Sequence, residues 1–144
     1  MSRLDKYIRR LTTEWITHQK IIIGVDFDST LSPYHSIDNM EDIQEVISVI
    51  KDAIITGAYV VIHTACNPDR YSEITNYCKS IGIVPDSINM TPIDLPYGKS
   101  GSKPYCNIFL DDRAGLLEAI LILKTALYCV RGKLNITNLL QQQF

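Results

Sequence analysis

Residues 21–30 read IIIGVDFDST, and this stretch decides the fold. Its first five residues form an apolar, mostly β-branched run without polar alternation, which is typical of a strand buried on both faces of a parallel sheet. The run ends at Asp26, and a second acid follows at Asp28. Ligands of such sheets bind beyond the carboxyl ends of the strands, so the stretch also predicts the edge at which a site lies.

Helices and strands alternate along the rest of the chain. Apolar residues recur at helical spacing in four segments, and short apolar runs lie between them. A loop over residues 91–104 is rich in proline and glycine, so it is not the interior of an element. The predicted helices cover about 3–18, 40–56, 67–81 and 116–132, and the predicted strands cover 21–25, 58–62, 83–90 and 106–110.

Capping residues mark the ends of these helices. Ser2 and Asp5 form a pattern like a capping box at the first helix, and Asn67 before Pro68 predicts the start of the third. The chain after the fourth helix has no assigned structure, and its glutamine run is interpreted as a frayed end. Three helices are predicted to stop at glycines, namely Gly57, Gly82 and Gly132.

The length and the order of the elements predict one domain. A chain of 144 residues, 46% of them hydrophobic, can bury a full core without a disulfide or metal. Strands separated by helices imply right-handed crossovers and a parallel sheet covered on both sides. We therefore expect a single-domain, doubly wound α/β fold with a Rossmann-like core over about 20–130, preceded by the helix over 3–18 and followed by a tail over 131–144.

Polar residues gather at the predicted carboxyl ends of the strands. A cluster of carboxylates repels itself unless a cation compensates, and hard oxygen ligands favour Mg²⁺. Each residue alone is more often a loop or cap residue than a catalyst, but the ordered set is specific. The set consists of Asp26, Asp28, Thr64, Lys103, Asp111 and Asp112.

In this order the residues resemble the motifs of the haloacid dehalogenase superfamily, whose members are mostly magnesium-dependent phosphohydrolases. The resemblance covers about residues 20–120. It depends on Asp26-Phe27-Asp28-Ser29-Thr30, on His63-Thr64, on Lys103, and on Ile108-Phe109-Leu110-Asp111-Asp112-Arg113.

The resemblance implies a role for each of these residues. Asp26 is the nucleophile that forms an aspartyl phosphate, and Asp28 is the general acid and then the base. Thr64 donates its hydroxyl to the phosphoryl oxygens, and Lys103 offsets the charge that the phosphoryl group shares with Asp26. Asp111 binds Mg²⁺ together with Asp26 and the main-chain oxygen of Asp28, and Asp112 lies in or just outside that shell.

Three positions depart from the pattern or leave it open. Ser29 stands where such proteins commonly have glycine, which restricts the backbone after Asp28. Lys99 competes with Lys103 as the cationic partner, although the spacing from Lys103 to Asp111 favours Lys103. Glu118 has no assigned role.

The intervals between the motifs leave no room for an inserted cap domain. The segments from Asp28 to Thr64 and from Thr64 to Lys103 are nearly filled by predicted core elements. The resemblance is therefore to capless members with open sites. Residues 29–40 then form a short flap, in which Tyr34 and His35 either contact substrate or lie in solvent.

These observations favour a Mg²⁺-dependent phosphomonoesterase with a nucleotide or another small phosphorylated metabolite as substrate. A phosphate group of a nucleic acid or a protein is the alternative substrate, but the formal net charge of −2 disfavours nucleic acid and an anionic membrane surface. A non-enzymatic aspartyl-phosphate switch or scaffold is the second class. The order of the acids argues against a receiver-like switch. Receiver domains have the paired acids on the first strand and the phosphorylated aspartate on a later one, whereas here Asp26-x-Asp28 comes first and the pair Asp111-Asp112 comes last.

The four cysteines contain no CxxC pair, and the first residues lack a secretory apolar stretch. No apolar run approaches the length of about 20 residues needed to cross a bilayer. We therefore expect a soluble, cytoplasmic protein with reduced thiols. The oligomeric state stays open: the first helix or the tail after Gly132 packs either on the core of the same chain or on a second copy in a homo-oligomer.

Overall fold

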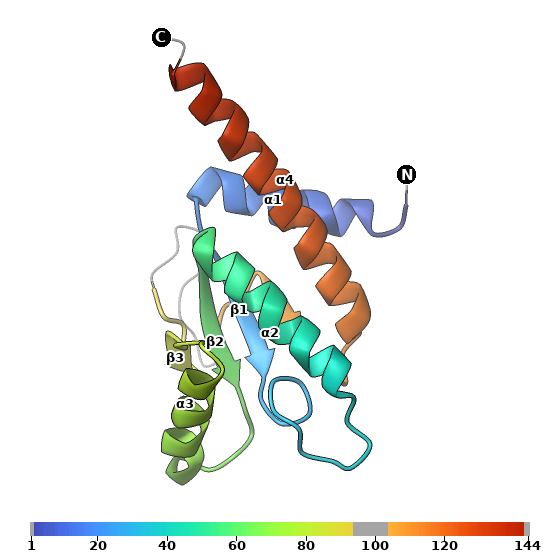
Figure 1. Ribbon diagram of the computed structural model, residues 1–144, viewed down its shortest axis with the longest axis vertical. Helices are drawn as coiled ribbons and strands as arrows, with labels where there is room; N and C mark the ends of the chain where they lie inside the picture. Colours follow the sequence, from blue (N-terminus) through green and yellow to red (C-terminus); the bar gives the residue numbers. More distant parts are fainter. Residues whose placement is uncertain (1, 94–103, 143–144) are drawn as a thin grey trace.

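A computed structural model describes the backbone of residues 2–93 and 104–142, and the side chains as far as Lys133. Four parallel strands form one sheet in the order β3-β2-β1-β4 (Figure 1). The predicted parallel α/β fold is therefore confirmed. The strands are β1 (Ile21–Asp26), β2 (Ala58–His63), β3 (Ser87–Ile88) and β4 (Ile108–Leu110).

Each of the four predicted helices is present. A short 3₁₀ turn, η1 (Pro68–Arg70), precedes the third of them. In Figure 1 the sheet lies behind α2, and α1 crosses behind α4 near the amino ends of the strands. The helices are α1 (Asp5–His18), α2 (Met40–Ile55), α3 (Tyr71–Ser80) and α4 (Leu116–Gln142).

Alternate residues of β1 pack on the two faces of the sheet. Ile21 and Ile23 belong to a large core cluster that includes buried residues of all four helices. Ile22 belongs to a smaller cluster on the other face, where Val61 and residues of the segments around Ile93 and Tyr105–Cys106 pack against it. In the part of the chain that the structure describes, the main face of the sheet thus carries the helices and the second face carries strand and loop residues.

Gly24 provides the space in which the second face packs. A Cβ atom at this position would lie 2.8 Å from Cys106 Sγ and 2.9 Å from Phe109 Cδ1. The His63 ring meets Phe109 edge to face, with ring centroids 5.1 Å apart. A glycine in the middle of a strand often marks such a close approach.

The long fourth helix corrects one prediction. α4 does not stop at Gly132 but continues to Gln142, beyond the body of the sheet (Figure 1). Gly57 and Gly82 follow the ends of their helices and have φ values of 99° and 81°, whereas Gly132 does not have a positive φ. Glycine in a helix interior lowers stability by only about 1 kcal/mol relative to alanine, so a single glycine need not end a helix of 27 residues.

Two smaller predictions also change. Asn67 starts a 3₁₀ turn rather than the α-helix, and its side chain makes no capping hydrogen bond. The strand expected over 83–90 is limited to Ser87–Ile88, because Pro85 lacks the N–H that a ladder needs. By contrast, the predicted contact at the first helix is present, since Ser2 donates from both its backbone N and its hydroxyl to the Asp5 carboxylate.

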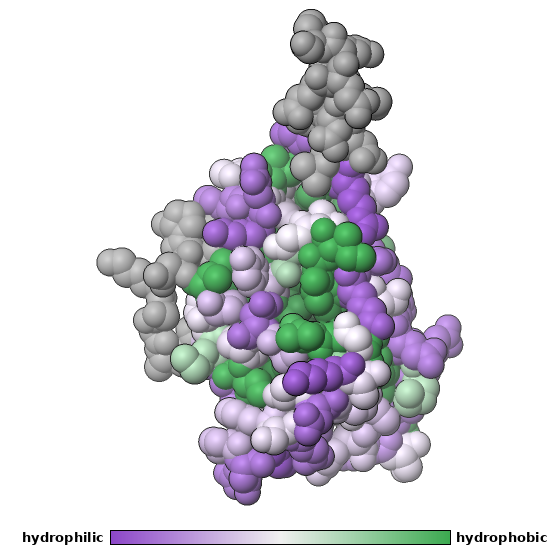
Figure 2. All heavy atoms as spheres, turned by 60° about the vertical axis from the view of Figure 1, so that its left-hand side comes forward, coloured by the Kyte–Doolittle hydropathy of each residue, from purple (hydrophilic) through white to green (hydrophobic). Residues whose placement is uncertain are grey.

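The strand order reverses beside β1. The chain runs from β1 to β2 and β3 on one side, and β4 then pairs with the other side of β1. The crevice at the carboxyl ends of β1 and β4 is therefore the expected binding position of this fold. Figure 2 shows hydrophilic residues gathered at this lower end of the molecule. Among the described residues, no helix is both long and apolar enough to cross a membrane.

Candidate active site

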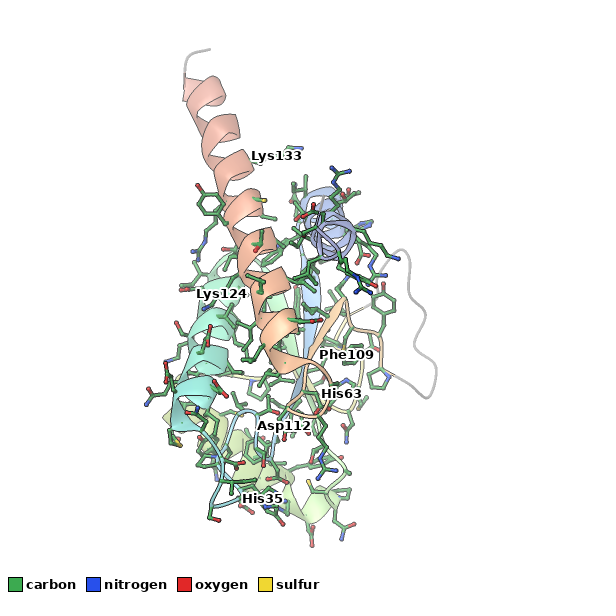
Figure 3. The ribbon with its side chains drawn as sticks, turned by 90° about the vertical axis from the view of Figure 1, so that its right-hand side faces the viewer. His35, His63, Phe109, Asp112, Lys124 and Lys133 are labelled. Atoms are coloured by element: carbon green, nitrogen blue, oxygen red, sulfur yellow. The ribbon has the colours of Figure 1, made fainter. Side chains whose placement is uncertain are left out.

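Three carboxylates meet at the carboxyl ends of β1 and β4. Asp26 is the last residue of β1, and Asp111 and Asp112 follow β4 directly. One carboxylate oxygen from each of the three lies within 4.8 Å of those of the other two. Figure 3 shows Asp112 at this end of the sheet, with His35 on the loop beyond it. The structure thus brings these three sequence-predicted residues together.

The Asp26 carboxyl is partly buried and close to two other carboxylates, and both features change its pKa. Burial raises the pKa of Asp26 to about 7, and the neighbouring Asp111 and Asp112 carboxylates add to the rise, while the hydrogen bond from Thr30 acts against it. Hard oxygen ligands at this spacing fit a divalent cation such as Mg²⁺, whose charge would relieve the repulsion. The donor set therefore fits the metal that the sequence implied.

Thr30 joins the two sides of this cluster. Its side chain is fully buried, and its hydroxyl donates to Asp26 Oδ2 at 3.0 Å. The Thr30 hydroxyl oxygen also accepts from the backbone N–H of Asp112 at 2.9 Å, and its hydroxyl lies within donating distance of Asp112 Oδ1, at 3.2 Å. Sequence reasoning gave Thr30 no role, although its place four residues after Asp26 was the available signal.

The turn after β1 depends on an unusual backbone conformation at Ser29. Ser29 has a φ of 68°, in the left-handed region that favours glycine. Its N–H donates to the Ser32 carbonyl at 2.8 Å, and the Phe27 carbonyl accepts from Leu31 and Ser32 at 3.0 Å. Ser29, which stands where the motif pattern commonly has glycine, therefore adopts a backbone conformation that glycine would adopt more easily.

Asp28 pairs with a residue that sequence reasoning missed. The Arg70 guanidinium donates from Nη1 to Asp28 Oδ2 at 3.3 Å and from Nη2 to Asp28 Oδ1 at 3.4 Å. These contacts to Asp28 raise the pKa of Arg70. Arg70 ends the 3₁₀ turn η1, and nothing in the sequence signals that this turn points it at Asp28.

Thr64 follows β2, and Asn89, which follows the neighbouring strand β3, makes two hydrogen bonds to its backbone. Its N–H donates to Asn89 Oδ1 at 3.0 Å, and Asn89 Nδ2 donates to the Thr64 carbonyl at 2.8 Å. Asn89 adopts a φ of 56° directly after β3, a conformation that asparagine tolerates better than most residues. The Thr64 hydroxyl oxygen accepts from Cys66 N at 3.2 Å, which leaves its proton to donate. Asn89 is a second residue that the sequence analysis did not identify.

These groups line one polar cavity of about 370 Å³. A larger cavity of about 710 Å³ lies on the other side of Asp111, but it contains none of the other site residues. We therefore place the site in the smaller cavity. The residues that line it include Asp26, Asp28, Thr64, Asp111, Asp112, Arg70 and Arg113, together with Tyr34 and His35 of the flap.

Three further positions named from the sequence are not among the residues that line the cavity in the described structure. Lys99 and Lys103 fall outside the described residues. Glu118 lines a neighbouring hollow with Asp112, Asp38 and Asp42 and does not line the cavity.

Comparison with known proteins supports the fold. No protein-family model matches the chain, and no curated protein matches it. The chain is similar to the solved structure of a conserved protein from Bacteroides thetaiotaomicron, with 20% sequence identity and a TM-score of 0.52 over 65% of this chain and 77% of that one. At this identity the similarity shows a shared fold and carries no activity with it.

Proposed function

We propose that this protein is a Mg²⁺-dependent phosphomonoester hydrolase of the haloacid dehalogenase type. The observation that carries the proposal is the meeting of Asp26, Asp111 and Asp112 within 4.8 Å at the switch point of the sheet. Asp28 and Thr64 line the same cavity, so each group that the chemistry needs among the described residues is within one site. Mg²⁺, held by Asp26 and Asp111 with Asp112 beside them, would supply positive charge that stabilises the phosphoryl group.

In the first step, a carboxylate oxygen of Asp26 attacks phosphorus, and the bond from phosphorus to the leaving oxygen breaks. Asp28 gives its proton to that oxygen, so an alcohol leaves and an aspartyl phosphate remains. The Thr64 hydroxyl donates to a phosphoryl oxygen and holds the group in line. In the second step, Asp28 takes a proton from water, the water oxygen bonds to phosphorus, and release of inorganic phosphate restores Asp26.

The flap lies beside the cavity and is held by hydrogen bonds of its own. The backbone N–H groups of Tyr34 and His35 both donate to Asp38 Oδ2, at 2.6 and 2.7 Å, which fixes this loop beside the cavity. A nucleotide or another small phosphorylated metabolite is the substrate we propose. A phosphorylated end of a nucleic acid is less favoured, because the net charge of −2 gives no long-range attraction to a polyanion.

The test measures hydrolysis of 4-nitrophenyl phosphate, of nucleoside monophosphates and of sugar phosphates, with Mg²⁺ and with a chelator. We expect turnover that needs the metal and that Asp26→Asn abolishes. Asp52→Asn, at the outer surface of α2, is the matched control and keeps the activity of the parent. No turnover of any substrate by the folded parent would contradict the proposal. A long-lived phosphate on Asp26 would instead support a switch.

A further inference from the structure

Arg70 occupies a position from which it can meet both the substrate and the proton donor. It lines the same cavity as Asp26 and Thr64, and about one third of its side chain is exposed to solvent. The 3₁₀ turn that carries it is closed by a hydrogen bond from Arg70 N to the Asn67 carbonyl at 3.0 Å. The backbone of Arg70 is therefore fixed, while its guanidinium reaches into a solvated space.

The contacts of the guanidinium leave it able to bind another anion. Its two N–H groups approach Asp28 at 3.3 and 3.4 Å, longer than the 2.7–2.9 Å typical of charge-assisted hydrogen bonds. Its Nε lies 3.6 Å from a carboxylate oxygen of the exposed Glu73. A guanidinium has five N–H donors in a planar fork that matches the oxygens of a phosphate. The pair with Asp28 is thus loose, and donors remain.

The negative charge of the cavity favours a cation such as the Arg70 guanidinium beside the phosphate. Four carboxylates line it, and a phosphomonoester brings close to two further negative charges. Among the described residues that line the cavity, the arginines are Arg70 and Arg113. The Arg70 guanidinium contacts the site acid Asp28, whereas Arg113 donates from its backbone N–H to Asp111. A phosphoryl group bound at Asp26 shares the 370 Å³ of this cavity with the Arg70 guanidinium.

We propose that Arg70 is a substrate-binding residue that exchanges one of its two hydrogen bonds to Asp28 for a phosphoryl oxygen of the substrate. This inference rests on the proposed function and deepens it. While both Asp28 oxygens accept from Arg70, neither is directed wholly at a leaving group. When the phosphate takes one N–H group, the remaining bond still orients Asp28 and the freed oxygen faces the substrate. Substrate binding and the positioning of the proton donor are thereby coupled.

Binding of inorganic phosphate tests the first half without any need for turnover. Calorimetry in the presence of Mg²⁺ compares the parent with Arg70→Ala, Arg70→Lys and Glu73→Gln. We expect Arg70→Ala to weaken binding by at least about tenfold, since a hydrogen bond to a charged group is lost. Arg70→Lys binds in between because it keeps the charge but not the fork. Glu73→Gln, which removes only the outer ion pair, binds like the parent. Equal binding by the parent and Arg70→Ala would overturn the proposal.

Kinetics test the second half. With Arg70→Ala we expect KM to rise for both glycerol phosphate and 4-nitrophenyl phosphate. Its kcat should fall more for glycerol phosphate, because the poorer leaving group depends more on a positioned acid. Guanidinium chloride at a few millimolar should restore part of the loss, and urea at the same concentration should not. If the parent is active and Arg70→Ala has the same kinetics, the role of Arg70 is refuted but the proposed function is not. If the parent is inactive, the proposed function is refuted, and the phosphate-binding result is unaffected.

Discussion

The raised pKa of Asp26, the proposed nucleophile, also affects the stability of the fold. Its pKa is raised from the ordinary value of 3.8 to about 7, mainly by burial and also by Asp111 and Asp112. The folded state therefore binds more protons than the unfolded state between about pH 4 and pH 7, and its stability falls as the pH rises through this window. Above pH 7 this contribution to stability is lost completely, because Asp26 is then ionised in the folded, metal-free protein, where burial disfavours its charge.

Asp26→Asn should consequently stabilise the metal-free protein. At pH 8 with a chelator we expect the variant to melt a few degrees above the parent, about 1 kcal/mol after allowance for the solvent exposure of this half-buried group. The difference should shrink as the pH falls from about 7 to about 4 and should vanish well below 3.8, where the parent carboxyl is protonated in both states. Thermal unfolding across this pH range checks it, and a variant that melts at or below the parent temperature at pH 8 would contradict the assignment of cause.

Thr30 gives a second prediction at the scale of one residue. Thr30→Val keeps the shape of this fully buried side chain but removes the hydroxyl that donates to Asp26 and accepts from the Asp112 N–H. We expect a loss of about 1–3 kcal/mol in the free energy of unfolding, measured by denaturant titration. Thr30→Ser retains the hydroxyl and serves as the control, which should lose clearly less. If both variants lose the same amount, the methyl group and not the hydrogen bond stabilises this position.

At the scale of the elements, glycine shows how far the sequence predicts and where it stops. Gly57 and Gly82 were expected to end helices and do so, because each adopts a positive φ. Gly132 was expected to do the same and lies inside α4 instead. The residue type alone cannot separate the two cases, since the outcome depends on whether the following chain continues to favour a helix.

This contrast is testable by one substitution at each position. A Cβ atom at Gly132 would meet nothing within 4 Å, so Gly132→Ala should raise the free energy of unfolding by about 0.5–1 kcal/mol. At Gly57 a Cβ atom would lie 2.8 Å from the Gln19 carbonyl oxygen at a φ of 99°, so Gly57→Ala should be destabilising. Denaturant titration of the two variants gives opposite signs if the helix passes through Gly132. A loss of stability in Gly132→Ala would argue that this position is not helical.

At the scale of the whole molecule, the sequence predicted the parts of the site that lie at strand ends. Asp26, Asp111 and Asp112 meet because parallel strands bring their carboxyl ends to one edge, and the hydrophobic pattern alone gives the strands. Arg70 and Asn89 were missed, because the first depends on the direction of a 3₁₀ turn and the second on a left-handed residue after a two-residue strand. Neither geometry leaves a periodic signal in the sequence.

The strand order also makes the site a junction between separate parts of the chain. Asp26 ends β1, whereas Asp111 and Asp112 follow β4, which is more than 80 residues away in sequence and, among the described strands, pairs with β1. A cation that binds all three carboxylates binds the folded state and not the separated strands. Such a ligand stabilises the fold by mass action, by about 2.7 kcal/mol at one hundred times its dissociation constant.

We therefore expect Mg²⁺ to raise the melting temperature at pH 8, by several degrees at saturation. The increase should be greatly reduced in Asp111→Asn, which removes one of the three carboxylate ligands. It should be retained in Arg70→Ala, because the Arg70 side chain contacts Asp28 and not these three carboxylates. Potassium chloride at matched ionic strength separates binding at this site from general screening of the acidic chain. Equal increases for the parent and Asp111→Asn would place the effect of Mg²⁺ elsewhere on the molecule and would remove the metal from the proposed site.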